Sequence, residues 1–211
     1  MNAQNPTYAQ KLFYTCKVWG FVKYFHSGVS TCQKNWDSIL VSRLPHIKNA
    51  VSHSDFNNEL DTLLNDAGPM TIVSGTLPDT LPGSLKRNRN FSWINDPIFR
   101  NDVKVMLDTI KNNFRPHAEC WVQNNNYTTG YNGYLVFPYD SLMLNTNTYS
   151  NYPNEATRLL VAFKHWNIIN YFNPYNYVLD SPWDSTLHNK ILSIANATND
   201  KDFYIAFKTI T

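Results

Sequence analysis

The sequence is poor in glycine and in charge, and it lacks the patterns that mark several classes of protein. Of its 211 residues, seven are glycine and 16% are charged, and the formal net charge is +2. No long run of lysine and arginine occurs, so we expect no nucleic-acid partner. No stretch approaches about 18 consecutive apolar residues, so the sequence predicts no transmembrane helix.

Short motifs for common catalytic and cofactor chemistry are also missing. The sequence contains no GxSxG, no HExxH and no glycine-rich phosphate loop, the patterns that place a nucleophile, a zinc ion or a phosphate group. We therefore predict no catalytic, cofactor-binding or metal-binding residue in this chain, and no cofactor. The histidines are scattered without a paired histidine–carboxylate cluster: His26, His46, His53, His117, His165 and His188.

Cysteine is scarce. Cys16, Cys32 and Cys120 are widely spaced, and their odd number excludes a complete set of disulfides within the chain. Cys16 lies among apolar residues, so we expect a small core side chain there. The disulfide state of all three stays open, including a Cys32–Cys120 bridge, and the cysteines do not fix the redox compartment.

What the chain does contain is the same segment twice. Residues 12–63 align with residues 159–210 without a gap at an offset of 147, and 15 of the 52 pairs are identical. Unrelated segments would share roughly three, so the match indicates a repeated supersecondary unit. Aromatic residues make up 15% of the chain, and many identical pairs are large: Trp19/Trp166, Tyr24/Tyr171, Phe25/Phe172, Trp36/Trp183 and Phe56/Phe203.

Each copy predicts three helices. Apolar residues at three- and four-residue spacing predict helices over residues 8–25 and about 36–50, where Pro45 predicts a kink or a break. A third helix is expected after Ser52, which lies three residues before Asp55, as in a capped first turn. The second copy predicts helices over about 154–172, from Pro182-Trp183 onward, and after a matching cap formed by Asn199 and Asp202.

Between the copies the chain changes character. Proline and glycine are frequent over residues 69–90, which predicts a long connection. Residues 96–114 predict one more helix opened by Asp96-Pro97. Alternating patches at 120–122 and 134–137 allow either short strands or an extended wrap over the helices.

These patterns predict an all-α fold of two duplicated three-helix units, joined by a connector with one helix and some irregular or short-strand structure. The expected boundaries are 1–66 for unit one, 67–153 for the connector and 154–211 for unit two. Apolar stripes on both units are expected to close into one core. The second copy reaches the last residue, so we expect the chain to be cut at a domain edge.

Two sets of residues could form a functional site, although each has a structural explanation. Asp37 and Asp184 follow the repeated tryptophans; they either form a carboxylate pair or each lie in the first turn of a helix, and the helix dipole explains both copies at once. Likewise, aromatics at helical spacing are more often core than a ligand platform. The platform candidates are Trp166, Tyr171, Phe172, Tyr175 and Tyr177, of which those after Pro174 are the expected exposed ones.

Two motifs carry a resemblance to a known family. Residues 17–26 (KVWGFVKYFH) followed by Asn35-Trp36-Asp37 resemble the N-terminal helical region of bacterial tail-specific (C-terminal-processing, tricorn-like) serine peptidases. Residues 158–160 (RLL) and 166–175 (WNIINYFNPY), followed by Trp183-Asp184, resemble a second helical segment of the same proteins. The first motif departs from the family at Ser27, where proline is frequent.

The resemblance implies a non-catalytic N-terminal scaffold or substrate-access region. The parent protein would be a serine-type endopeptidase that cleaves peptide bonds through an acyl-enzyme, and its catalytic residues would lie beyond residue 211. The implied partners are the downstream peptidase domain of the same polypeptide and a polypeptide substrate. Residues 1–6 do not resemble a signal peptide, so these residues allow either a cytosolic protein or an exported protein whose signal peptide has been removed. The family resemblance implies the second alternative, with a location in the periplasm, at the cell surface or outside the cell.

A second function remains open. A stand-alone helical module could bind a peptide or a glycan on exposed aromatics, and the connector supplies Tyr127, Tyr131, Tyr134 and Tyr139 as candidates. The oligomeric state, the order of the connector and the substrate of the parent peptidase are not determined by the sequence.

Overall fold

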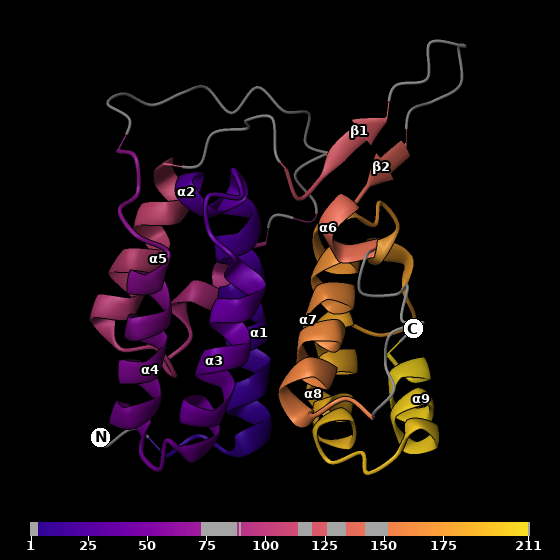
Figure 1. Ribbon diagram of the computed structural model, residues 1–211. Helices are drawn as coiled ribbons and strands as arrows, with labels where there is room; N and C mark the ends of the chain where they lie inside the picture. Colours follow the sequence, from indigo (N-terminus) through magenta and orange to yellow (C-terminus); the bar gives the residue numbers. More distant parts are fainter. Residues whose placement is uncertain are drawn as a thin grey trace.

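The protein is all-α in a computed structural model that describes residues 4–72, 88, 90–113, 120–125, 134–141 and 152–210 (Figure 1). Nine α-helices lie in these residues, with one two-stranded sheet. No helix among them is long and apolar enough to cross a membrane.

The first three long helices lie where the sequence predicts them. They are α1 (Tyr8–Phe25), α3 (Trp36–Asn49) and α4 (His53–Asp66), and the one-turn helix α2 (Ser27–Ser30) follows α1. Of the two outcomes predicted at Pro45, the break is wrong, because α3 is continuous through it, and the kink stays a prediction. A proline inside a helix costs about 3 kcal/mol, and the buried face that runs the length of α3 offsets that cost; it consists of Trp36, Leu40, Leu44 and Ile47.

The last three long helices are α7 (Glu155–Phe172), α8 (Trp183–Ala195) and α9 (Asp200–Lys208). Pro182 is the residue before α8 rather than its first residue. The short 3-10 helix η3 (Asn176–Val178) lies between α7 and α8.

The predicted caps of α4 and α9 are confirmed. The Ser52 hydroxyl accepts a hydrogen bond from the Asp55 backbone N–H, and the Asp55 carboxylate accepts one from the Ser52 N–H, both at 3.0 Å. In α9, Asn199 Oδ1 accepts from the Asp202 N–H at 2.9 Å. Each cap satisfies donors that the first helical turn leaves unpaired.

The connector contains η2 (Ser92–Asn95), α5 (Asn101–Asn113), β1 (Gln123–Asn125), β2 (Tyr134–Val136) and α6 (Pro138–Ser141). The two strands pair antiparallel. Strand β2 lies in the predicted patch, whereas β1 begins one residue after the other patch.

Helix α5 starts five residues later than the sequence predicts. Asp96 does not open it, because both carboxylate oxygens are used elsewhere: Oδ1 accepts from the Ile98 N–H at 2.9 Å and Oδ2 from the Tyr14 hydroxyl at 2.5 Å. The first bond folds residues 96–98 into a turn of the kind aspartate favours, so the helix begins only at Asn101.

Tryptophan pairs hold α1 to α3 and α7 to α8 in the same way. The Trp19 indole N–H donates to the Trp36 carbonyl at 3.2 Å, and the Trp36 indole donates to the Trp19 carbonyl at 3.0 Å. Trp166 and Trp183, each 147 residues further on, exchange the same two bonds at 3.2 and 3.1 Å. Each pair satisfies two indole N–H donors, which are buried in the first pair and partly buried in the second.

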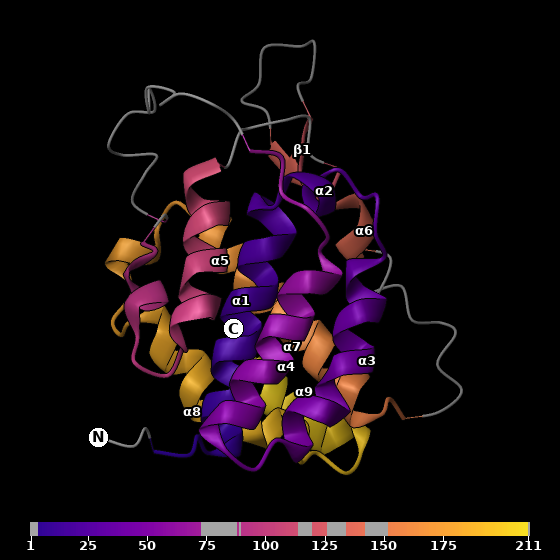
Figure 2. The same cartoon turned by 90° about the vertical axis from the view of Figure 1, so that its left-hand side faces the viewer.

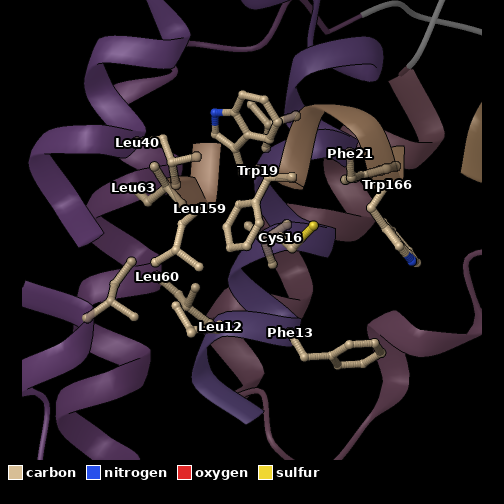
Figure 3. Close-up of a cluster of buried hydrophobic side chains, with 14 of the residues drawn as sticks. Leu12, Phe13, Cys16, Trp19, Phe21, Leu40, Leu60, Leu63, Leu159 and Trp166 are labelled. Atoms are coloured by element: carbon tan, nitrogen blue, oxygen red, sulfur yellow. The ribbon is translucent and has the colours of Figure 1, made fainter. Parts of the chain in front are cut away.

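Helices α1 and α7 run side by side through the middle of the protein (Figures 1 and 2). The Tyr24 ring lies edge-on against Tyr171, with 5.8 Å between centroids. Further down, Gly20 faces the Asn167 carboxamide, which leaves no space for a Cβ on residue 20. One buried cluster spans both halves of the chain, and Figure 3 shows Leu159 of α7 among side chains of α1, α3 and α4.

Cys32 and Cys120 form a disulfide, and Cys16 is free and buried. The bridge ties the loop after α2 to the connector across 88 residues of sequence. Closing a loop of that length in the unfolded chain contributes about 4.6 kcal/mol in the chain-entropy treatment. Nearby, the Trp121 indole N–H donates to the Val29 carbonyl at 2.7 Å, which fixes the connector on α2.

We expect His26 to make the stability of the protein dependent on pH. Its Nδ1 accepts a hydrogen bond from the Gly28 N–H at 3.2 Å, so the ring is needed in its neutral form. Burial, with a smaller effect of Lys34, lowers the pKa of His26 against the opposing Gly68 hydrogen bond. The unfolded state therefore binds more protons, and we expect the free energy of unfolding to fall as the pH drops through about 6.5.

Urea denaturation at pH 7.5 and pH 5.5 measures this effect. His26→Asn keeps a capping acceptor and should show a smaller loss of stability than the wild type. His188→Asn, at an exposed position, is the control and should leave the loss unchanged. Equal losses in all three proteins would contradict the role of His26.

Candidate functional site

Two ion pairs cross between the two sets of helices. Lys17 Nζ on α1 lies 2.6 Å from Asp184 Oδ2 on α8, and Lys164 on α7 pairs with Asp37 on α3. Residues 17 and 164, and residues 37 and 184, are each separated by 147. Both aspartates lie in the first turn of their helices, as the helix-dipole explanation predicts. Each also binds a lysine of the other set of helices.

Residues of the connector cover the Lys164–Asp37 pair. Lys23, whose side chain is 0% exposed, lies 2.7 Å from the Asp140 carboxylate of α6, and Lys164 lies 3.0 Å from the same carboxylate. The Trp121 ring covers Lys23, with 4.4 Å from Nζ to the centroid. Burial lowers the pKa of Lys23, and Asp140 and Asp37 oppose that effect. Two lysines and two aspartates thus balance within one buried cluster.

The Lys17–Asp184 pair is open to solvent. Its aspartate side chain is 51% exposed, and beside it lies a hollow of about 230 Å³. The hollow is lined by carboxamides, two tryptophans and the ion pair: Lys17, Asn88, Asn90, Ser92, Trp93, Asn170, Asn176, Pro182, Trp183 and Asp184. We call this hollow the Lys17 pocket.

Among the described residues that line the Lys17 pocket, one positive charge and one negative charge balance. The cluster around Lys23 contains two lysines and two aspartates. In the Lys17 pocket, Asn170 occupies the position equivalent to Lys23, so Lys17 has no neighbouring lysine there and Asp184 neutralises its charge. Lys17 Nζ also lies against the Trp93 and Trp166 rings, 5.6 and 5.7 Å from their centroids. The pocket therefore suits a neutral group that forms hydrogen bonds and packs on an aromatic ring.

One acceptor in the Lys17 pocket has no partner. Asn176 Nδ2 donates to the carbonyls of Ile169 and Asn170 at 2.8 and 3.1 Å. Its Oδ1 is buried and makes no hydrogen bond to the part of the chain that the structure describes. Buried acceptors are usually paired, so a donor on a bound ligand would satisfy this atom.

The predicted aromatic platform is divided. Trp166 is buried, and Tyr171 and Phe172 pack against the core, whereas Tyr175 and Tyr177 are exposed as expected. None of these five lines the Lys17 pocket.

Of the connector tyrosines, Tyr139 does not line that pocket. Tyr127 and Tyr131 lie outside the described residues, and Tyr134 lies in β2. Tyr139 is half exposed and contacts the Trp121 ring.

The histidines and cysteines in the described part of the chain do not form a metal site. Within the ranges described above, no three side chains of histidine, cysteine, aspartate or glutamate lie close enough to hold a metal ion. His165 is partly buried, and burial lowers its pKa; its ring packs on Phe207 with 5.1 Å between centroids. His165 lies 147 residues after the buried Val18, and its contact with Phe207 is a packing contact at the same position of the repeat.

The Lys17 pocket was not predicted from the sequence. The identical lysines at 17 and 164 were the available signal. When both a lysine and an aspartate are identical in the two copies, a repeated ion pair is indicated. The asparagines at 88, 90 and 176 carry no such signal, since they come from segments without periodicity.

Comparison with known proteins gives no relative for this chain: no protein-family model, no curated protein and no solved structure matches it.

Proposed function

We propose that this chain is the non-catalytic N-terminal scaffold or substrate-access region of a tail-specific-type serine peptidase. The observation that carries the proposal is the position of the two motifs that resemble that family. Residues 17–26 and 166–175 include the ends of α1 and α7, where the two helices lie against each other in the middle of the protein. The motifs thus belong to one central interface rather than to two unrelated helices.

The proposal includes a tandem duplication: α1, α3 and α4 form unit one, and α7, α8 and α9 form unit two. The matching tryptophan pairs and the crossed ion pairs support it, since both recur at the 147-residue offset. Contacts between equivalent residues, such as Tyr24 with Tyr171, support a two-fold axis between α1 and α7. Two units joined by contacts between equivalent residues are suited to holding another domain in place.

In the parent protein, peptide-bond hydrolysis through an acyl-enzyme would be performed by a serine outside this chain. The partners would be the peptidase domain of the same polypeptide and an unfolded polypeptide substrate. We also propose a periplasmic, cell-surface or secreted location. The Cys32–Cys120 disulfide is consistent with it, because such bonds persist mainly in oxidising compartments.

Activity-based labelling tests the proposal. An antibody against this chain would capture the native polypeptide, which would then be treated with a fluorophosphonate that reacts with activated serines. We expect a labelled polypeptide that hydrolyses an unstructured peptide, and no hydrolysis by the isolated 24.4 kDa chain. A captured polypeptide without label or activity, or hydrolysis by the isolated chain, would contradict the proposal.

The Lys17 pocket favours a second function, the binding of a peptide or glycan by a stand-alone module. Its two tryptophans allow a direct test by fluorescence titration with neutral oligosaccharides and short peptides. We expect a saturable change with one class that is lost in Trp93→Ala. A flat response to every ligand would count against this function.

A further inference from the structure

The connector covers one outer face of unit one. Helix α5 packs on α4 and α1, and its buried residues Val103, Leu107 and Ile110 have the spacing of a single helix face. In Figure 1, α5 lies on the side of unit one that is away from unit two. An amphipathic helix is thus what closes this face.

Asn57 of α4 fixes the start of that helix. Its side chain is fully buried; Nδ2 donates to the Ile98 carbonyl at 3.0 Å, and Oδ1 accepts from the Arg100 N–H at 2.7 Å. Phe21 of α1 is buried beside the same segment, with its ring 5.7 Å from that of Trp93.

No helix in the described part of the chain closes the equivalent face of unit two in this way. In unit one, Val18, Phe21, Asn57 and Leu60 are all 0% exposed. The residues 147 positions later are partly or largely exposed, and we call them the α7/α9 face: His165, Ile168, Tyr204 and Phe207. Tyr204, at the position of Asn57, is 66% exposed. Among the described helices, α9 packs on α8, and none takes the place of α5 (Figure 1).

The α7/α9 face is also more apolar than a solvent-facing surface requires. Isoleucine, phenylalanine and tyrosine make up three of its four residues, and the neighbouring Ile205 is 52% exposed. Tyrosine in place of asparagine removes the backbone clamp of unit one and adds aromatic area, a composition typical of binding surfaces.

We propose that the α7/α9 face binds an amphipathic helix of another polypeptide segment, with aliphatic residues at positions i, i+4 and i+7. The internal precedent is α5, which closes the equivalent face with this pattern. The inference rests on the proposed scaffold function, since the bound helix would be the contact through which unit two holds its partner.

A peptide of residues 92–113 tests the proposal. The same residues of the chain already cover the face of unit one, so the added peptide would have to bind the α7/α9 face. We expect the fluorescently labelled peptide to bind the chain saturably, with a rise in its helix content. Leu107→Asp in the peptide should weaken binding at least tenfold, since it places a charge in the buried stripe.

The matched chain variants are Tyr204→Glu and Val51→Glu. Both alter exposed residues, the second being 80% exposed on unit one, so neither should unfold the protein, which circular dichroism would verify. We expect Tyr204→Glu to weaken binding at least tenfold and Val51→Glu to leave it unchanged.

Absence of saturable binding, or equal binding by both variants, would overturn the proposal. Dimerisation of the wild-type chain that Tyr204→Glu abolishes, without peptide binding, would overturn it in favour of self-association. These results do not depend on fluorophosphonate labelling, so failure of the helix site and failure of the peptidase assignment are distinguishable.

Discussion

Replacing Asp140 by alanine is expected to lower the free energy of unfolding by about 3–5 kcal/mol, the loss typical of breaking a buried ion pair. Asp140 Oδ1 and Oδ2 lie 2.7 and 3.0 Å from Lys23 Nζ, and the Lys23 side chain has no exposed area. Removing the carboxylate leaves two buried lysines facing Asp37 alone, and the uncompensated charge carries most of the loss.

The loss should depend on pH in a defined direction. Burial already lowers the pKa of Lys23, and Asp140 opposes this effect. Without Asp140 the pKa falls further, so the unfolded state binds more protons than the folded state. Stability of the variant should therefore rise as the pH is raised toward the ordinary lysine value of about 10.4.

Asp102→Ala is the control for Asp140→Ala. Asp102 pairs with Arg100 at 2.6 Å on the surface, where ion pairs contribute less than about 1 kcal/mol. Urea denaturation of both variants measures the difference. Equal small losses would show that the cluster around Lys23 is not buried as described.

Gly20→Ala is expected to destabilise the protein by about 1–3 kcal/mol, the range for overpacking a core. A Cβ at residue 20 would lie 1.9 Å from Asn167 Oδ1 and 2.0 Å from Cγ. In an open helix the same change would stabilise by up to about 1 kcal/mol, so the sign itself is informative. The whole carboxamide is in the way, and its Nδ2 is held by the Cys16 carbonyl at 3.1 Å.

Asn167→Gly provides the matched test of the contact. Alone it removes the hydrogen bonds of Nδ2 and should destabilise. Combined with Gly20→Ala it exchanges which helix carries the small residue, and the double variant should be more stable than the sum of the single losses predicts. Additive losses would contradict a direct contact between residues 20 and 167.

The sequence predicted the helices well where local signals were strong. The helix at residues 8–25 was placed correctly because its apolar spacing is regular, and α4 was placed by the Ser52/Asp55 cap. Signals of this kind act within one or two turns, so they do not require knowledge of the tertiary structure.

The charged sites could not be predicted in the same way. The first-turn positions of Asp37 and Asp184 were foreseen, but which lysine each would bind depends on how α1 and α7 pack. Asp140 and Trp121, which close the cluster at Lys23, come from a segment without periodicity. The Cys32–Cys120 bridge was left open for the same reason, because spacing in the sequence does not give distance in the fold.

The proposed two-fold relation between the units underlies both the scaffold proposal and the α7/α9 face, and the crossed pair Lys17–Asp184 tests it most directly. The measurement is a double-mutant cycle of urea denaturation with Lys17→Asp, Asp184→Lys and the charge-exchanged double variant. If the pair crosses between units, the double variant should recover at least about 1 kcal/mol beyond additivity. Single losses that add within about 0.5 kcal/mol would contradict the crossed arrangement.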